Sequence, residues 1–136
     1  MRTIKYQGIY RPTGEKFEVY KLDFLNETVH GVFDGSESDY CIYSLTPNGK
    51  GDAWVREYTG LKDKNGTEIY EGDIVENLRG RRSKIVWSDE EMGWVAESKY
   101  PNGDDSVLML VDLNAIATIG VIGNTFQNPE LLEVAQ

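Results

Sequence analysis

Four tight-turn signals divide this chain of 136 residues into short segments. The signals lie at Pro12 to Gly14, Pro47 to Gly49, Lys64 to Gly66 and Pro101 to Gly103. Asparagine and glycine adopt positive φ at little cost, and Asn-Gly is the strongest short signal for a β-hairpin. Turns that recur in this way favour a fold made of hairpins over a fold made of long helices.

The segments between the turns are rich in β-branched and aromatic residues, which are typical of strands. No window keeps apolar residues at the i, i+3, i+4, i+7 spacing long enough for a full helix. The predicted strands are residues 4–10, 17–22, 27–33, 41–45, 73–75, 83–87, 93–97, 107–111, 115–119 and 120–122. The sequence therefore predicts a mainly β fold.

We expect a single domain made of two lobes, because a chain of this length supports one domain or two small intimate lobes. An N-terminal β-hairpin lobe is predicted at about 1–50 and a connecting hairpin at about 51–70. The C-terminal lobe, about 70–122, carries short strands of this kind, and five such strands suit a small SH3-like barrel.

The end of the chain carries the clearest helix signal. Asn128 is a residue type that caps helices, and Pro129 suits the first helical position. The sequence predicts a short helix at about 128–134, with Leu131 and Leu132 docked on the barrel.

The formal net charge of −9 is uneven, with −2 in residues 1–68 and −7 in residues 69–136. An acidic surface repels phosphate backbones, so general nucleic-acid binding is disfavoured. The acidity serves solubility, or alternatively it imitates DNA toward a DNA-binding protein. The single Cys41 excludes an internal disulfide. No signal peptide or membrane-spanning run is present, so a cytoplasmic protein is expected.

The stretch 58–76, YTGLKDKNGTEIYEGDIVE, could be a metal loop, the mouth of an active site, or a turn. A calcium loop needs glycine at its sixth position and glutamate at its twelfth. Counting from Asp63, Asn65 fits the pattern, but Gly66 falls at the fourth position and Ile74 at the twelfth. We therefore predict a turn followed by the entry of a strand.

No catalytic, metal-binding or cofactor-binding residue stands out. His30 is the only histidine and lies in a predicted strand, and Cys41 is interpreted as a small core residue. The paired carboxylates at 90–91 and 104–105 sit on predicted hairpin tips, where both members are solvated alike. The sequence thus favours a protein that is not an enzyme and that needs no cofactor.

One basic cluster precedes a tryptophan. The candidate nucleic-acid patch consists of Arg79, Arg81, Arg82, Lys84 and Trp94. Cations beside aromatic rings can grip single-stranded DNA or RNA by charge and stacking. The alternative is a solvated hairpin tip with its tryptophans in the core.

Two segments carry a family resemblance. Residues 58–76 resemble the signature segment of the phage-related YopX family, and residues 119–133, IGVIGNTFQNPELLE, resemble its closing segment. The resemblance implies a small β protein encoded by a phage or prophage, with some members forming oligomers and with no established activity. The family motif then implies structural turns and caps at Gly60, Asp63, Asn65, Gly66, Gly72, Asp73, Gly123, Asn124, Asn128 and Pro129.

The first hypothesis is a non-enzymatic phage or prophage accessory protein in the bacterial host cytoplasm that acts by binding and self-assembly. It would form a homo-oligomer and could bind a host or phage protein. The candidate contacts between copies are Tyr58, Leu61, Ile69 and Tyr70. The alternatives are a nucleic-acid module, which binds through the basic patch or mimics DNA, and, with least support, a small hydrolase.

Overall fold

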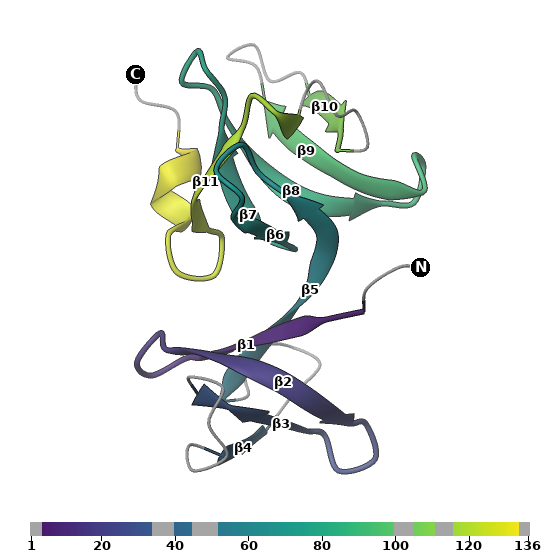
Figure 1. Cartoon of the computed structure of the whole chain (residues 1–136), viewed down its shortest axis with the longest axis vertical. Coiled ribbons are helices and arrows are strands. Elements are labelled where there is room, and N and C mark those ends of the chain that lie inside the picture. The colour runs from purple at the N-terminus through teal and green to yellow at the C-terminus, as the bar shows by residue number, and fades with distance from the viewer. Residues whose placement is uncertain (1–3, 34–39, 45–51, 100–104, 111–115, 134–136) are drawn as a thin grey trace. The chain divides into compact units, whose positions relative to one another are not determined.

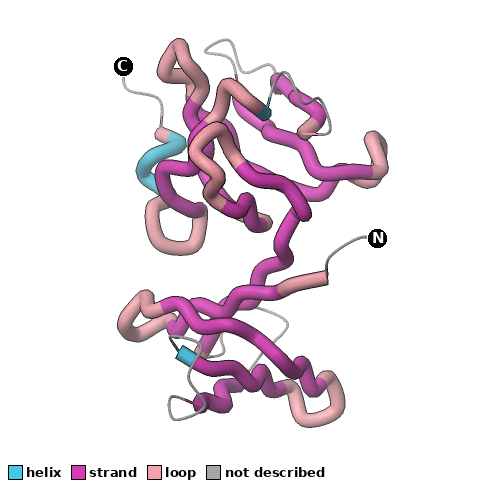
Figure 2. Tube along the Cα trace, viewed as in Figure 1, coloured by secondary structure: helices cyan, strands magenta, loops and turns pink. Residues whose placement is uncertain are grey.

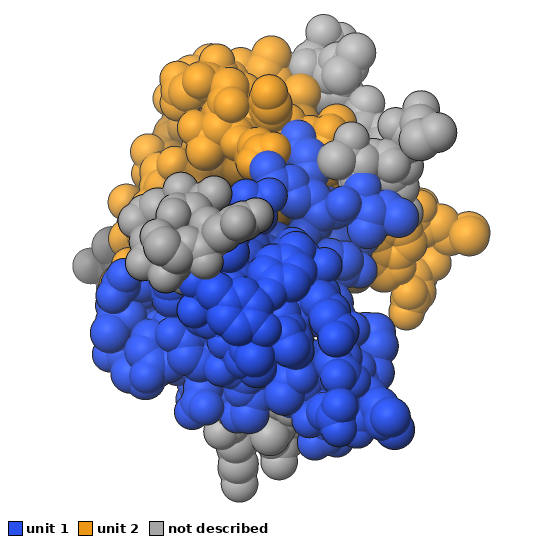
Figure 3. All heavy atoms as spheres, turned by 60° about the horizontal axis from the view of Figure 1, so that its bottom comes forward, with its two compact units in different colours: residues 1–58 blue, residues 59–136 orange. Residues whose placement is uncertain are grey.

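Antiparallel strands make up most of the computed structural model, which describes residues 4–33, 40–44, 52–99, 105–110 and 116–133 (Figure 2). The chain divides into two units, unit 1 at Met1–Tyr58 and unit 2 at Thr59–Gln136 (Figure 3). The boundary lies inside the segment that the sequence predicts as the connection, at about 51–70.

Unit 1 is a curved sheet around an aromatic core. Its strands are β1 (Tyr6–Tyr10), β2 (Lys16–Asp23), β3 (Thr28–Val32), β4 (Tyr40–Ser44) and the first part of β5 (Ala53–Lys62), in the order β4-β3-β2-β1-β5 (Figure 1). One face buries Phe17, Val29 and Cys41. A Cβ on Gly8 or Gly31 would overlap the Phe17 ring, so these two strands need glycine where the ring packs.

Strand β5 continues from unit 1 into unit 2 and pairs there with β6 (Glu68–Tyr70). Gly60 lies within β5 with a φ of +88°, a value that L side chains adopt only with strain. The hydroxyl of Thr59, also in β5, donates to the carbonyl oxygen of Ile69 at 2.7 Å. Both residues are buried, so this bond holds the two strands together inside unit 2.

Unit 2 contains a second antiparallel sheet. Its strands are β7 (Asp73–Glu76), β8 (Arg82–Ser88), β9 (Gly93–Lys99), β10 (Asp105–Met109) and β11 (Gly120–Asn124), in the order β10-β9-β8-β7-β11. The core cluster consists of Ile69, Val75, Ile85, Trp94, Ala96, Leu110, Ile116 and Ile119. The sheet has five strands, the number that the predicted barrel needs, and its closure into an SH3-like barrel stays a prediction.

The prediction of a mainly β fold is confirmed, and two local predictions need correction. The C-terminal helix is a 3-10 helix, η3 (Pro129–Leu132), and the Asn128 side chain makes no cap hydrogen bond to it. Residues 116–119 form a turn rather than a strand. Position 134 of the predicted helix and position 115 of the predicted strand lie outside the described residues. Within the described chain, no helix has the length and apolar character that crossing a membrane requires.

Candidate functional site

The two segments of the family resemblance meet at the carboxylate of Asp63, which is 7% exposed. Its Oδ1 accepts the backbone N–H groups of Asn65 at 2.8 Å and Thr67 at 2.9 Å. Its Oδ2 accepts the N–H of Val121 in β11 at 2.8 Å. One side chain therefore closes its own turn and also fastens β11, which lies 58 residues further along the chain.

The backbone around Asp63 reinforces this connection. Lys64 donates its N–H to the carbonyl oxygen of Ile119 at 3.0 Å, and Gly66 donates to the carbonyl oxygen of Asp63 at 3.0 Å. Gly66 has a φ of +81° with open space around it. The predicted left-handed step of the turn is thus present, and the Asp63 side chain satisfies backbone donors.

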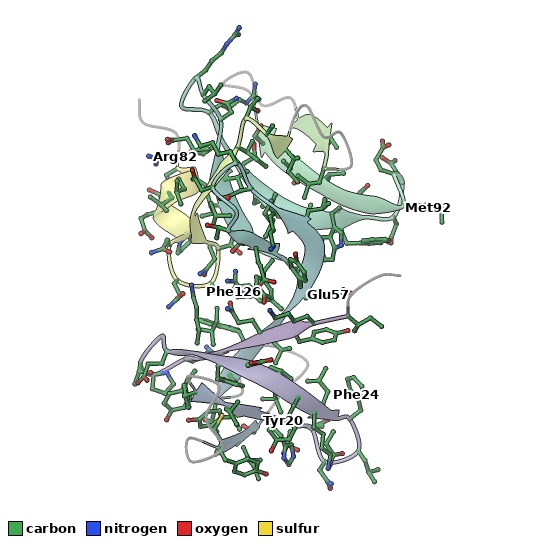
Figure 4. The ribbon with its side chains drawn as sticks, viewed as in Figure 1. Tyr20, Phe24, Glu57, Arg82, Met92 and Phe126 are labelled. Carbon is green, nitrogen blue, oxygen red and sulfur yellow. The ribbon has the colours of Figure 1, made fainter. Side chains whose placement is uncertain are left out.

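A second junction joins the turn before β7 to the turn after β11. Asp73 Oδ2 accepts the N–H of Tyr70 at 2.7 Å, and Gly72 between them has a φ of +80°. The carbonyl oxygen of Gly72 accepts the N–H of Thr125 at 2.7 Å. A Cβ on Gly72 would lie 2.6 Å from a ring carbon of Phe126, which Figure 4 labels. Both the backbone angle and the close ring require glycine here.

Asn124 closes this second junction and is 2% exposed. Its Oδ1 accepts the N–H of Gln127 at 2.8 Å, and its own N–H donates to Asn128 Oδ1 at 3.3 Å. The side chain of Asn128 therefore serves the turn at the end of β11, while its carbonyl oxygen accepts the N–H of Leu131 in η3 at 3.0 Å. Gly123 lies within β11, where a Cβ would come 2.8 Å from Asn128 Oδ1 and from a methyl carbon of Leu131. Leu131 thus packs over the strand. Pro129 is the first residue of η3.

The polar side chains of these motif residues accept hydrogen bonds from main-chain N–H groups. Among the residues that the structure describes, no group of three or more histidine, cysteine, aspartate or glutamate side chains is placed to hold a metal ion. Chemically, the arrangement satisfies backbone N–H groups, and those that are buried, such as the N–H of Tyr70, would otherwise cost free energy.

Three of the four candidate contacts between copies are buried, and the fourth is partly buried. Tyr58, Ile69 and Tyr70 are buried, and Leu61 packs against the core of unit 2. In this structure they stabilise the chain itself. The prediction of self-assembly therefore needs another surface.

The candidate nucleic-acid patch is partly engaged within unit 2. Arg82 Nε forms an ion pair with Glu76 Oε2 at 3.0 Å. Arg82 also donates from Nη1 to the carbonyl oxygen of Leu131, a residue of η3 (Figure 4). The side-chain nitrogen Nζ of Lys84 lies 3.8 Å from Glu97 Oε1.

The other members of the patch differ in exposure. Arg81 Nε donates to Ser98 Oγ at 3.0 Å, and Arg79 is exposed. Trp94 is 7% exposed and packs edge-on against Trp87, which is 45% exposed. The burial of Trp94 keeps its ring from stacking on a base, and Trp87 is the more accessible ring.

Among the residues that the structure describes, neither His30 nor Cys41 has the surroundings of a catalytic pair. His30 Nδ1 lies 3.0 Å from the Tyr40 hydroxyl, and its Nε2 lies 3.3 Å from Thr28 Oγ1. Burial raises the pKa of the Cys41 thiol, which lowers the fraction of reactive thiolate at neutral pH.

A cluster of two exposed tyrosines and a half-buried histidine on unit 1 was not predicted from the sequence. Tyr20, His30 and Tyr40 contact one another with ring centroids 5.9 to 6.3 Å apart. Desolvation by packing and a hydrogen bond to Tyr40 raise the pKa of Tyr20 to about 12. The alternation of strands 17–22 and 27–33 could have placed Tyr20 and His30 on one face, but the bulge between Val19 and Lys21 breaks that alternation.

Comparisons with known proteins give a family and similar solved structures. No curated protein matches the chain. The crystal structure of protein EF1440 from Enterococcus faecalis is 28% identical, with a TM-score of 0.52, and the match covers 98% of this chain and 100% of that one. The family model described as YopX protein matches residues 13–133. Since this match extends over most of the chain, the protein belongs to the YopX family.

Proposed function

We propose that this protein is a non-enzymatic accessory protein of a phage or prophage, and that it acts in the bacterial cytoplasm by binding and self-assembly. The observation that carries the proposal is the use of the motif side chains. Asp63, Asp73 and Asn124 accept backbone N–H groups at 2.7 to 2.9 Å and are at least nine-tenths buried. Side chains bound in this way support a surface rather than perform chemistry.

Exposed apolar side chains supply the binding surface in this proposal. They are Tyr20, Tyr40 and Ile42 in unit 1; the rings of Tyr20 and Tyr40 contact each other and His30, and Ile42 is paired with His30. Exposed apolar groups that gather in one place mark interaction sites. The chemistry around His30 fits the same proposal, because the two hydrogen-bond neighbours that the structure describes for its ring are hydroxyl groups.

Light scattering coupled to size-exclusion chromatography tests self-assembly. We expect a mass above 15.4 kDa at micromolar concentration, with dissociation on dilution. A monomer at every concentration would contradict it. A pull-down from bacterial lysate with the intact chain, with and without nuclease, separates a protein partner from a nucleic-acid partner.

A nucleic-acid module is the second candidate, favoured by the exposed Arg79 and by the half-exposed Trp87 that follows the basic cluster. The ion pairs of Arg82 and Lys84 with Glu76 and Glu97 oppose it, because they reduce the local positive charge.

Filter binding with single-stranded DNA and RNA tests this candidate. Direct binding would weaken steeply with salt, since cations on the protein release counterions from the phosphates. A DNA mimic would bind no nucleic acid and would instead compete for a DNA-binding protein. Arg79→Ala serves as the test variant, and Lys16→Ala, an exposed cation in unit 1, is the matched control.

A further inference from the structure

Strand β8 has turns of opposite charge at its two ends. Residues 77–81 join β7 to β8, and residues 89–92 join β8 to β9. Both turns lie within residues 52–99, which the structure describes without a break. We define the basic tip as residues 78–82, with the sequence LRGRR, and the acidic tip as residues 89–92, with the sequence DEEM.

Asn77 fixes the backbone of the basic tip. Its side-chain oxygen Oδ1 accepts the N–H groups of Arg79 and Arg81, each at 2.9 Å. Its own N–H donates to the carbonyl oxygen of Arg81 at 2.9 Å, and its carbonyl oxygen accepts the N–H of Gly80 at 3.0 Å. Leu78 is 74% exposed, and Arg79 is also exposed. An ordered turn therefore presents an apolar side chain next to a cation, and little backbone conformational entropy is lost when it binds.

Positive charge in the second half of the chain is concentrated in this tip. Residues 69–136 contain five basic residues, and three of them are the arginines of the tip. Arg82 is paired with Glu76, and Arg81 donates from Nε to Ser98 Oγ. Arg79 takes part in neither of the ion pairs that the structure describes in unit 2. Its guanidinium is thus open to a carboxylate from a partner.

The acidic tip is also ordered by side chains. Ser88 Oγ accepts the N–H of Glu91 at 3.2 Å, and Trp87 Nε1 donates to Asp89 Oδ1 at 3.0 Å. The three acidic residues of the tip are exposed. Met92 is 81% exposed, and Trp87, just before the tip, is 45% exposed. This end of β8 therefore presents apolar side chains beside carboxylates, which complements the basic tip in charge.

The two tips are too far apart to contact each other within one copy. β8 contains seven residues. A strand rises about 3.3 Å per residue, so roughly 20 Å separates its ends. Figure 4 shows Arg82 and Met92 on opposite sides of unit 2. An ion pair needs a separation of about 4 Å or less. Arg79 can therefore reach the carboxylates of the acidic tip only in another copy.

We propose that the basic tip of one copy docks on the acidic tip of a second copy. Arg79 then lies among the carboxylates of residues 89–91, and Leu78 packs on Met92 and on the exposed part of Trp87. This inference rests on the proposed self-assembly and names its surface. The contact joins two different surfaces, so it repeats from copy to copy until a ring closes, or it continues as a chain.

A second copy is the occupant that the charges favour. A nucleic acid would engage the basic tip alone, and the formal charge of −7 in residues 69–136 would repel its phosphates. A second copy engages both tips with one kind of contact. The tyrosine cluster of unit 1, formed by Tyr20, His30 and Tyr40, takes no part and stays available to a partner of another kind.

The size of the tips makes the assembly reversible. Three large apolar side chains and one group of charges make a surface well below the roughly 800 Å² per partner of a standard interface. The attraction acts between exposed charges, which salt screens. The dissociation constant of the wild-type assembly should therefore rise as salt is added.

The first test is this dissociation constant, measured on the full chain by light scattering and analytical ultracentrifugation at low and high salt. Arg79→Glu places a carboxylate among those of the acidic tip, and Glu90→Lys/Glu91→Lys places cations opposite the arginines of the basic tip. We expect each variant to raise the constant on the order of tenfold or more, because like charges then face each other.

Matched controls change the net charge by the same amount on unit 1. Lys16→Glu matches the first variant and Glu15→Lys/Glu18→Lys matches the second, and all three residues are exposed. Both controls should leave the constant unchanged, which separates the charge of the tips from the charge of the whole chain.

A mixture of the two tip variants separates docking from misfolding. Arg79→Glu presents a carboxylate at both tips, and Glu90→Lys/Glu91→Lys presents cations at both tips, so neither variant should assemble with itself. When the two are mixed in equal amounts, each copy meets a tip of opposite charge, and assembly should return.

The outcomes distinguish this inference from the proposed function. A wild-type chain that is monomeric at every concentration and salt would overturn both the proposed self-assembly and the docking of the tips. A wild-type oligomer that neither tip variant weakens, or that the unit 1 controls weaken as much, would overturn the docking of the tips alone. So would a mixture that stays dissociated although each variant weakens assembly.

Discussion

Removing the Asp63 carboxylate should destabilise unit 2 more than any exposed acidic substitution. The carboxylate accepts the N–H groups of Asn65, Thr67 and Val121 at 2.8 to 2.9 Å and is nearly buried. A hydrogen bond to a charged group contributes about 1.5–3 kcal/mol, and a buried donor left unsatisfied costs about 1–3 kcal/mol.

The free-energy cost of losing the carboxylate is smaller at the two exposed turn residues. Asn65 and Thr67 are exposed, so water can reach their N–H groups once the carboxylate is gone, whereas Val121 is only partly exposed. We therefore expect Asp63→Ala to lower the free energy of unfolding by roughly 3–4 kcal/mol. Asp63→Asn keeps one oxygen acceptor but turns an amide NH₂ group toward a backbone donor, and it should cost about 2 kcal/mol.

Urea unfolding followed by tryptophan fluorescence measures both variants, because Trp87 and Trp94 report on unit 2. Glu90→Ala, at the exposed tip of the β8–β9 hairpin, is the control and should change stability by about 0.5 kcal/mol or less. A loss below about 1 kcal/mol for Asp63→Ala would refute the reasoning. So would a divalent cation that stabilises the natural chain and not Asp63→Asn, since the carboxylate would then be a metal ligand.

Two further predictions concern single positions. Gly72→Ala should lower the free energy of unfolding by about 2–3 kcal/mol. Gly72 has a positive φ, and the added Cβ would lie 2.6 Å from a ring carbon of Phe126. Gly66→Ala, with a similar φ and open space, should cost only about 1 kcal/mol, and equal losses in urea unfolding would contradict the packing argument. In a spectrophotometric titration, one tyrosine should ionise near pH 12 and disappear from that range in Tyr20→Phe. Because the folded pKa of Tyr20 is raised above the usual 10.0, its contribution to stability is complete below pH 10 and is lost as the pH rises toward 12. A tyrosine titration that is complete by pH 11 would show that packing against Tyr40 does not raise the pKa of Tyr20.

Turns were predictable because their causes are local. The positive φ at Gly66 and Gly72 follows from residue type and from one or two neighbours, and the sequence states both. The partner of Asp63 at Val121 was not predictable, because a hydrogen bond across 58 residues leaves no trace in either segment alone. The same limit explains Asn128, whose side chain binds Asn124 instead of capping a helix.

The longest strand lies in the predicted connecting hairpin at about 51–70, but its bounds were not predicted, for a different reason. β5 runs from Ala53 to Lys62, but Arg56 and Glu57 interrupt its apolar pattern. Arg56 is 3% exposed, and its guanidinium donates from Nε and Nη2 to the side-chain oxygen of Gln7 in β1. A buried arginine with a partner 49 residues away cannot be recognised from periodicity.

The carboxylate that fastens β11 also sets an order of events during synthesis. The Asp63 turn can form as soon as residues 63–67 leave the ribosome, since its first two bonds are local. Its third hydrogen bond, from the N–H of Val121 to Asp63 Oδ2, cannot form until Val121 has been synthesised. Unit 1 has no such dependence in its own strand ladder from β4 to β5. A nascent chain arrested before residue 119 should therefore hold a folded first unit beside a second unit that proteases can still cut.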